Sequence, residues 1–122
     1  RRVLFRSCTD LLETIIVSDV RSFAQDPRFC LSVMAEIACR ALSPAVNDPG
    51  TAIDVIGRGV RILSAYAQNK IDETEVIYPS VHVAPLQIKD LLEDFFLPVA
   101  RDGASMREIQ IRVLKGVRGP MM

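Results

Sequence analysis

The sequence has few of the residues from which reactive or cross-linked sites are built. It has three cysteines, Cys8, Cys30 and Cys39, an odd number with no Cys-x-x-Cys pair. This pattern favours neither a disulfide framework nor a zinc site. Cys30 and Cys39 lie in apolar segments, where free thiols usually pack as small hydrophobic side chains. We therefore expect a reducing compartment, and neither a metal nor a cofactor.

The chain also lacks an excess of charge. Fifteen basic and fifteen acidic residues cancel, so the overall charge does not steer the chain toward a polyanion. Two helices joined near Asp48 could form a DNA-binding pair, but Asp48 and Asp54 would lie at the end that approaches the groove. No nucleic-acid partner is predicted.

Long apolar runs are absent. The best candidate for a membrane span, Phe29 to Leu42, contains Glu36 and Arg40 and is shorter than the roughly 18 residues that a span requires. We expect this segment itself to be soluble.

The first seven residues do not fit a natural start. The chain has no initiator methionine and no signal-like opening, and residues 1–7 resemble an adapter-derived or cloning-derived string. Without Arg1, Arg2 and Arg6 the formal charge becomes minus three, because twelve basic residues then face fifteen acidic ones. Residues 8–122 are expected to form a single helical domain, a fragment of a longer protein.

The central element of the predicted fold is a buried helix from about Phe29 to Leu42. Asp26 followed by Pro27 has the form of an N-cap with proline at the first helical position. Glu36 and Arg40 have the spacing of an ion pair. Apolar residues at three-and-four spacing predict burial over much of the circumference. These are Phe29, Cys30, Val33, Met34, Ile37, Ala38, Ala41 and Leu42.

Proline ends this helix, because Pro44 disfavours a helical conformation at Ser43. The next helix should begin at Asp48 or Pro49 and run to about Asn69. It contains Gly57 and Gly59, which cost about 1 kcal/mol each in helix propensity. We expect close approach of another helix to offset that cost.

The remaining predicted elements are a helix at Asp10 to Val17, a β-hairpin at residues 76–83, a helix from Pro85 or Leu86 to about Asp102, and a last helix with Ser105 and Glu108 as a capping box. The predicted fold is thus mainly α, with about five helices and one short β-hairpin.

Polar side chains concentrate at the corner between the two longest predicted helices. Each has a local backbone role: Ser43 closes the first helix, Asn47 forms a turn, and Asp48 with Thr51 caps the second. The alternative is that the corner converges with upstream residues into a polar pocket or a subunit contact. This candidate site comprises Arg21, Asp26, Arg40, Ser43, Asn47, Asp48 and Thr51.

Other chemistry has little support in the sequence. Ser43 has no Gly-x-Ser-x-Gly setting, and the one histidine, His82, is about forty residues away. Asp48 and Asp54 are six residues apart and would not share a helix face in adjacent turns, so they make a poor metal or acid–base pair. No catalytic residue is predicted.

The last predicted helix is locally basic, with Arg107, Arg112, Lys115 and Arg118 against Glu108. A solvated face is the simplest interpretation. Contact with anionic lipid headgroups is the alternative if the domain lies beside a membrane.

A long pattern around the corner is that of a known family. It comprises Arg21, Gln25, Asp26, Pro27 and Phe29, followed by Ala38, Arg40, Ala41, Leu42, Ser43, Pro44, Ala45, Asn47, Asp48, Pro49, Thr51 and Ala52. It resembles the signature region of domain of unknown function family 2254, a set of bacterial predicted membrane proteins. The likeness runs from about Leu12 to Val117, and Cys30 stands where the family is expected to have glycine.

The resemblance implies that several membrane helices precede this segment in a full-length protein of the bacterial inner membrane. The segment itself would be the soluble, cytoplasmic C-terminal portion. The family has no assigned reaction, so we expect a non-catalytic domain that acts in assembly or regulation. Its partner would be a second copy or the membrane domain of the same chain. The alternative is a small-ligand or enzymatic site built on the corner from Arg40 to Thr51.

Overall fold

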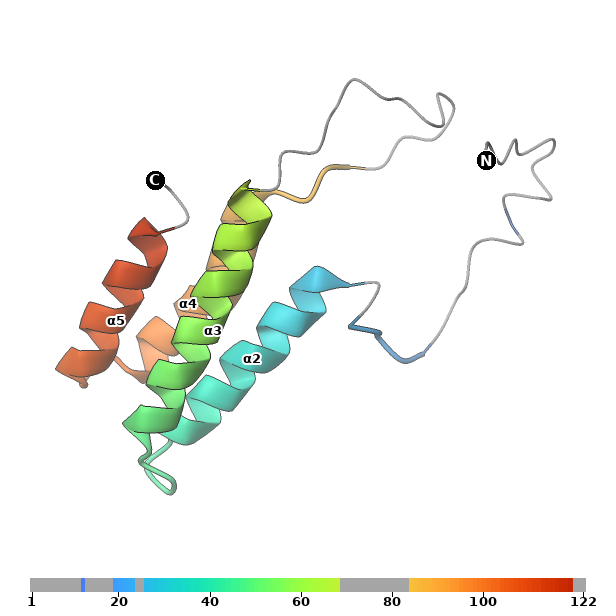
Figure 1. The fold of residues 1–122 in the computed structure, drawn as a ribbon. Coiled ribbons are helices and arrows are strands. Elements are labelled where there is room, and N and C mark those ends of the chain that lie inside the picture. The colour runs from blue at the N-terminus through green and yellow to red at the C-terminus, as the bar shows by residue number, and fades with distance from the viewer. Residues whose placement is uncertain (1–11, 13–18, 24–25, 69–83, 120–122) are drawn as a thin grey trace.

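The computed structural model describes residues 12, 19–23, 26–68 and 84–119, and this part of the chain forms a helical bundle. Helices α2 and α3 lie side by side, α4 packs against both, and α5 packs on α3 and α4 (Figure 1). No contact joins α2 to α5 within these residues. The helices are α2 at Pro27–Leu42, α3 at Pro49–Gln68, α4 at Ile88–Asp102 and α5 at Arg107–Arg118.

The structure confirms a mainly helical fold, and the described residues contain four helices and no strand, compared with the predicted five helices and one β-hairpin. The predicted helix at residues 10–17, apart from Leu12, and the predicted hairpin at residues 76–83 lie outside the described residues.

Helix α2 begins where the sequence predicts. Asp26 has an extended backbone and its carboxylate accepts a hydrogen bond from the Phe29 amide, while Pro27 occupies the first helical position. Ser43, also extended, ends the helix. The buried face is made mostly of small side chains, which let α3 and α4 approach closely. It consists of Leu31, Ala35, Ala38, Ala41 and Leu42.

One side of α2 is more open than its sequence suggests. Ile37, predicted to face inward, is 49% exposed. The predicted ion pair between Glu36 and Arg40 does not form among the described residues, and both side chains are exposed. An exposed pair gains little Coulomb energy and loses side-chain entropy, so its absence costs the fold little.

Close helix approach explains one of the two glycines within α3. A Cβ atom at Gly59 would lie 2.2 Å from Cζ of Phe95 on α4, so the aromatic ring rests directly on the α3 backbone. The predicted offset by a neighbouring helix is therefore confirmed at Gly59. At Gly57 a Cβ would meet the Arg112 guanidinium at 3.1 Å, the far end of a flexible side chain.

Helices α4 and α5 begin later than predicted. Helix α4 starts at Ile88, and its Phe95 and Phe96 rings meet edge to face with centroids 5.0 Å apart. Helix α5 has Met106 as its N-cap with no side-chain cap bond, so the predicted Ser105–Glu108 capping box is wrong. The preceding turn is closed instead by the Met106 amide, which donates to the Gly103 carbonyl at 3.0 Å.

The two glycines of α3 allow a matched test of this packing. Gly59→Ala should destabilise the chain by about 1–3 kcal/mol because the methyl group overlaps the Phe95 ring. Gly57→Ala should be neutral or stabilising by up to about 1 kcal/mol, since alanine favours the helix and the Arg112 side chain can move. Urea denaturation of both variants measures the difference. Equal shifts in the unfolding midpoint would contradict the packing at Gly59.

Candidate functional site

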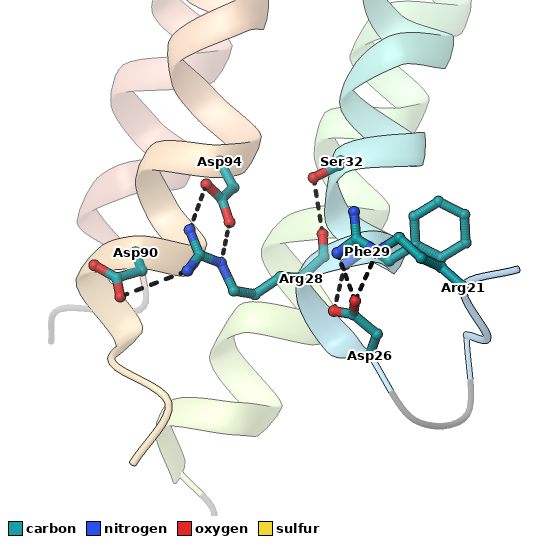
Figure 2. Close-up of polar contacts among 7 residues, drawn as sticks. All are labelled: Arg21, Asp26, Arg28, Phe29, Ser32, Asp90 and Asp94. Carbon is teal, nitrogen blue, oxygen red and sulfur yellow. Dashed lines mark hydrogen bonds and ion pairs between the residues drawn. The ribbon is translucent and has the colours of Figure 1, made fainter. Parts of the chain in front are cut away.

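The N-terminal end of α2 holds a compact group of charged and aromatic side chains (Figure 2). Arg21 donates through Nε to Oδ2 of Asp26 at 2.8 Å and pairs with it through Nη2. The Arg21 guanidinium also lies 4.7 Å from the centroid of the Phe29 ring, on which Phe23 stacks at 5.1 Å. The Phe29 amide and then the Arg21 guanidinium lower the pKa of Asp26. Two residues of the predicted site, Arg21 and Asp26, are thus in contact with each other.

Arg28 joins this end of α2 to α4. Its Nε donates to Oδ2 of Asp94 at 2.6 Å and its Nη2 donates to Oδ1 at 3.0 Å. Its Nη1 lies 4.0 Å from Oδ2 of Asp90, and Figure 2 shows the guanidinium between the two carboxylates. The hydrogen bonds to Asp94 raise the pKa of Arg28. This two-pronged geometry orients α2 against α4 more strictly than a single contact would.

At the other end of α2, the polar corner residues bind the local backbone. The Ser43 hydroxyl donates to the Arg40 carbonyl at 2.7 Å. Asn47 has a positive φ of 48°, a conformation that asparagine tolerates better than most residues. Asp48 accepts from the Thr51 amide at 3.0 Å through Oδ1 and from the Thr51 hydroxyl through Oδ2. Thr51 in turn lowers the pKa of Asp48 through these two bonds.

The structure brings the predicted site residues together as two separate groups. Arg21 and Asp26 lie at the start of α2. The other five lie around the opposite end of that helix: Arg40 and Ser43 at its C-terminus, Asn47 and Asp48 in the connection, and Thr51 in the first turn of α3. Helix α2 has 16 residues and is therefore about 24 Å long. One pocket within a single chain cannot include both groups.

A shallow cavity of about 230 Å³ lies between α2 and α4. Within it, Cys39 is half-buried, and burial, followed by a hydrogen bond to Asp102, raises the pKa of its thiol to about 11. Pro98 has no amide hydrogen, so it removes the helical hydrogen bond to the Asp94 carbonyl. The cavity is lined by Ser32, Ala35, Glu36, Cys39, Asp94, Pro98 and Arg101.

Sequence reasoning missed the contact of Arg28 with Asp94. The two residues are 66 positions apart, and Asp94 fits the pattern of a solvated helix position. A single sequence offers no periodicity or motif that would pair them. The capping role of Asp26 could be predicted because its partner, the Phe29 amide, is only three residues away.

The sequence profile of domain of unknown function family 2254, described as a predicted membrane protein, matches residues 6–118. The chain belongs to this family. Uncharacterized proteins of Mycobacterium tuberculosis and Mycobacterium bovis are each 61% identical to it over 36 residues. Each match covers 30% of this chain and 7% of the relative, so the chain spans only a small part of the length of those proteins. No solved structure matches the chain.

Membership of the family confirms the resemblance seen in the sequence. Among the helices of the described residues, none is both long enough and apolar enough to span a bilayer.

Removal of the Asp48 cap should lower stability at neutral pH. Because folding lowers the pKa of Asp48, its contribution is present above the unfolded value near 3.8 and is lost as the pH falls through the lower folded value. Asp48→Ala should therefore reduce Tm on the order of 5 °C at pH 7. The difference from the unaltered chain should narrow below about pH 4, as thermal melts followed by circular dichroism will show.

Asp48→Asn is the matched control, because asparagine keeps a capping oxygen without a charge. Its Tm should lie between those of the other two proteins at pH 7. An Asp48→Ala variant as stable as the unaltered chain at pH 7 would count against the capping role.

The Cys39 thiol should react slowly with alkylating reagents. Its pKa of about 11, against an ordinary value of 9.0, leaves about a hundredfold less thiolate at pH 8. In a variant with Cys8→Ser and Cys30→Ser, the rate of iodoacetamide modification should keep rising up to about pH 11. Asp102→Asn should increase the rate, since it removes a neighbouring negative charge. A plateau near pH 9 would disprove the raised pKa.

Proposed function

We propose that this chain is a non-catalytic, cytoplasmic domain of a bacterial inner-membrane protein and that it acts in assembly, by pairing with a second copy. The pairing surface is the α2 outer face, defined as Phe29, Val33 and Ile37 with the flanking Glu36 and Arg40. The observation that supports it most directly is the 49% exposure of Ile37.

The apolar residues of this face form a continuous stripe. Phe29, Val33 and Ile37 are four residues apart along α2, so they lie above one another on one side of the helix. Phe23, 60% exposed, extends the stripe through its stacking on Phe29. Helices α3 and α4 pack against the opposite side of α2, where the alanines are buried, so Ile37 is exposed while Phe29 and Val33 are partly buried. A partner that covers the stripe would gain hydrophobic burial.

The charges beside the stripe favour a second copy as that partner. Glu36 and Arg40 are exposed and form no ion pair among the described residues. In an antiparallel pair of α2 helices with its two-fold axis close to Ile37, Glu36 of one copy lies opposite Arg40 of the other. Such an interface is self-complementary, as a two-fold dimer requires.

The alternative of a ligand or enzymatic site at the corner has less support. Both carboxylate oxygens of Asp48 accept hydrogen bonds from Thr51, and the Ser43 hydroxyl donates to the Arg40 carbonyl. These groups would have to give up capping bonds before they could bind a ligand.

The test is the oligomeric state of the chain in solution. Sedimentation equilibrium should show a dimer, and Ile37→Glu should shift it to monomer because a buried glutamate would be unpaired. Leu97→Glu is the matched control, since Leu97 is 63% exposed on α4 and outside the pairing surface. It should leave the dimer intact. Circular dichroism verifies that both variants are folded.

A charge exchange tests the predicted geometry. Glu36→Arg alone should weaken the dimer by placing arginines opposite one another, and Glu36→Arg with Arg40→Glu should restore it. A monomeric unaltered chain would overturn the proposal, as would a dimer unaffected by Ile37→Glu. Association of the monomer with the membrane portion of a longer chain would then identify that portion as the partner.

A further inference from the structure

The outward side of α5 combines exposed aliphatic and cationic side chains. Ile111 is 53% exposed and Leu114 is 65% exposed. Arg107 lies four residues before Ile111, and Arg118 lies four residues after Leu114. This spacing places all four on one side of the helix, opposite the buried Ile109, Val113 and Gly116. We call these four residues the α5 outer face.

Charge is distributed unevenly between the helices. Helix α5 contains four cationic residues and Glu108, a net charge of plus three, while α4 contains two cationic residues and four carboxylates, a net charge of minus two. The ion pairs recorded among the described residues include no residue of α5. The positive charge of α5 thus remains available, although the whole chain is formally neutral.

A shallow cavity beside the same helix extends this positive surface. It measures about 160 Å³, lies between α3 and α5, and has Gly57 and Gly116 in its lining. Arg112 and Lys115 line it together with Val60. The space suits a phosphate-sized group with two cations beside it.

These observations indicate that the partner of α5 has a surface that is both anionic and apolar. We propose that the α5 outer face docks on the anionic headgroups of a membrane, with Ile111 and Leu114 at the acyl boundary. Arg107 and Arg118 can lay their aliphatic stems along that boundary while their guanidinium groups reach lipid phosphates. A nucleic-acid backbone would match the charges but would leave the two aliphatic side chains without an apolar partner.

Membership of a family described as predicted membrane proteins agrees with a bilayer as the partner. The docking surface is separate from the proposed dimer contact, because α2 and α5 do not touch within the described residues and lie on opposite sides of α3 (Figure 1). Each proposal can therefore fail without the other.

Vesicle co-sedimentation of the 122-residue chain tests the proposal. The chain should bind vesicles of phosphatidylglycerol and phosphatidylcholine and should not bind vesicles of phosphatidylcholine alone. Raising NaCl from about 0.1 to about 0.5 M should weaken binding, since salt screens exposed charges. Arg107→Gln with Arg118→Gln should reduce the partition coefficient about 25-fold, about fivefold for each cation near an anionic surface.

The aliphatic part of the face is tested with Ile111→Ser and Leu114→Ser in one variant. It should lower binding at least tenfold even at low salt, because burial of the two side chains is lost. The matched control is Lys89→Gln with Leu97→Ser, which removes one exposed cation and one exposed aliphatic side chain from α4. It should bind as the unaltered chain does. All variants are compared at equal helicity by circular dichroism.

Several results would overturn the proposal. They are equal binding to neutral and anionic vesicles, equal loss in the α5 and α4 variants, and no binding to anionic vesicles at low salt. Displacement by inorganic phosphate, but not by chloride of equal ionic strength, would instead identify a site for the free anion and would also overturn it. The Ile37→Glu variant keeps the α5 outer face and should still prefer anionic vesicles, whatever its oligomeric state.

Discussion

The bundle depends on the contact of the Phe95 ring with the α3 backbone at Gly59. A Cβ atom at Gly59 would lie only 2.2 Å from Cζ of Phe95. The absence of a side chain at Gly59 therefore lets α4 approach α3 closely. Phe95 is fully buried, and its ring meets the Phe96 ring edge to face. The Phe96 ring in turn lies where a Cβ atom at Gly116 of α5 would come within 3.0 Å of it. Aromatic rings on α4 thus occupy the space that glycines leave on α3 and α5. This complementarity sets the spacing of three helices at once, and α2 adds a face of alanines that accepts the same close packing.

The parts of the fold that depend on local chemistry could be predicted from the sequence. Asp-Pro pairs mark the starts of α2 and α3, because the carboxylate caps free amides and proline suits the first helical turn. The end of α2 at Ser43 follows from Pro44 in the same way. The last helix was predicted correctly, but its Ser105–Glu108 capping box was wrong, because a Ser-x-x-Glu pattern is common and competes with other ways to close a turn. Here the Gln110 side chain donates to the carbonyls of Ala100 and Gly103, and the helix starts after Met106.

Long-range features could not be predicted because local periodicity and short motifs do not reveal which helices become neighbours. Arg28 and Asp94 each look like solvated positions, and their pairing requires knowledge that α2 and α4 lie side by side. The exposure of Ile37 has the same origin. Its periodicity indicates an apolar helix, but burial depends on how many neighbours surround that helix, and in the described residues α2 has two, α3 and α4. The sequence likewise predicted a single site, whereas the structure places its residues in two groups, one at each end of α2.

The two groups have a common structural consequence. At one end, Asp26 caps α2 while Arg28 binds Asp94 on α4; at the other end, the Ser43 hydroxyl and the left-handed Asn47 direct the chain into α3. A helix held at both ends cannot rotate about its axis without breaking one of these contacts. The side of α2 that faces away from α3 and α4 is therefore fixed, and with it the position of Ile37. The polar residues at the two ends of α2 thus have a structural role: they determine which apolar side chains of α2 face away from the bundle.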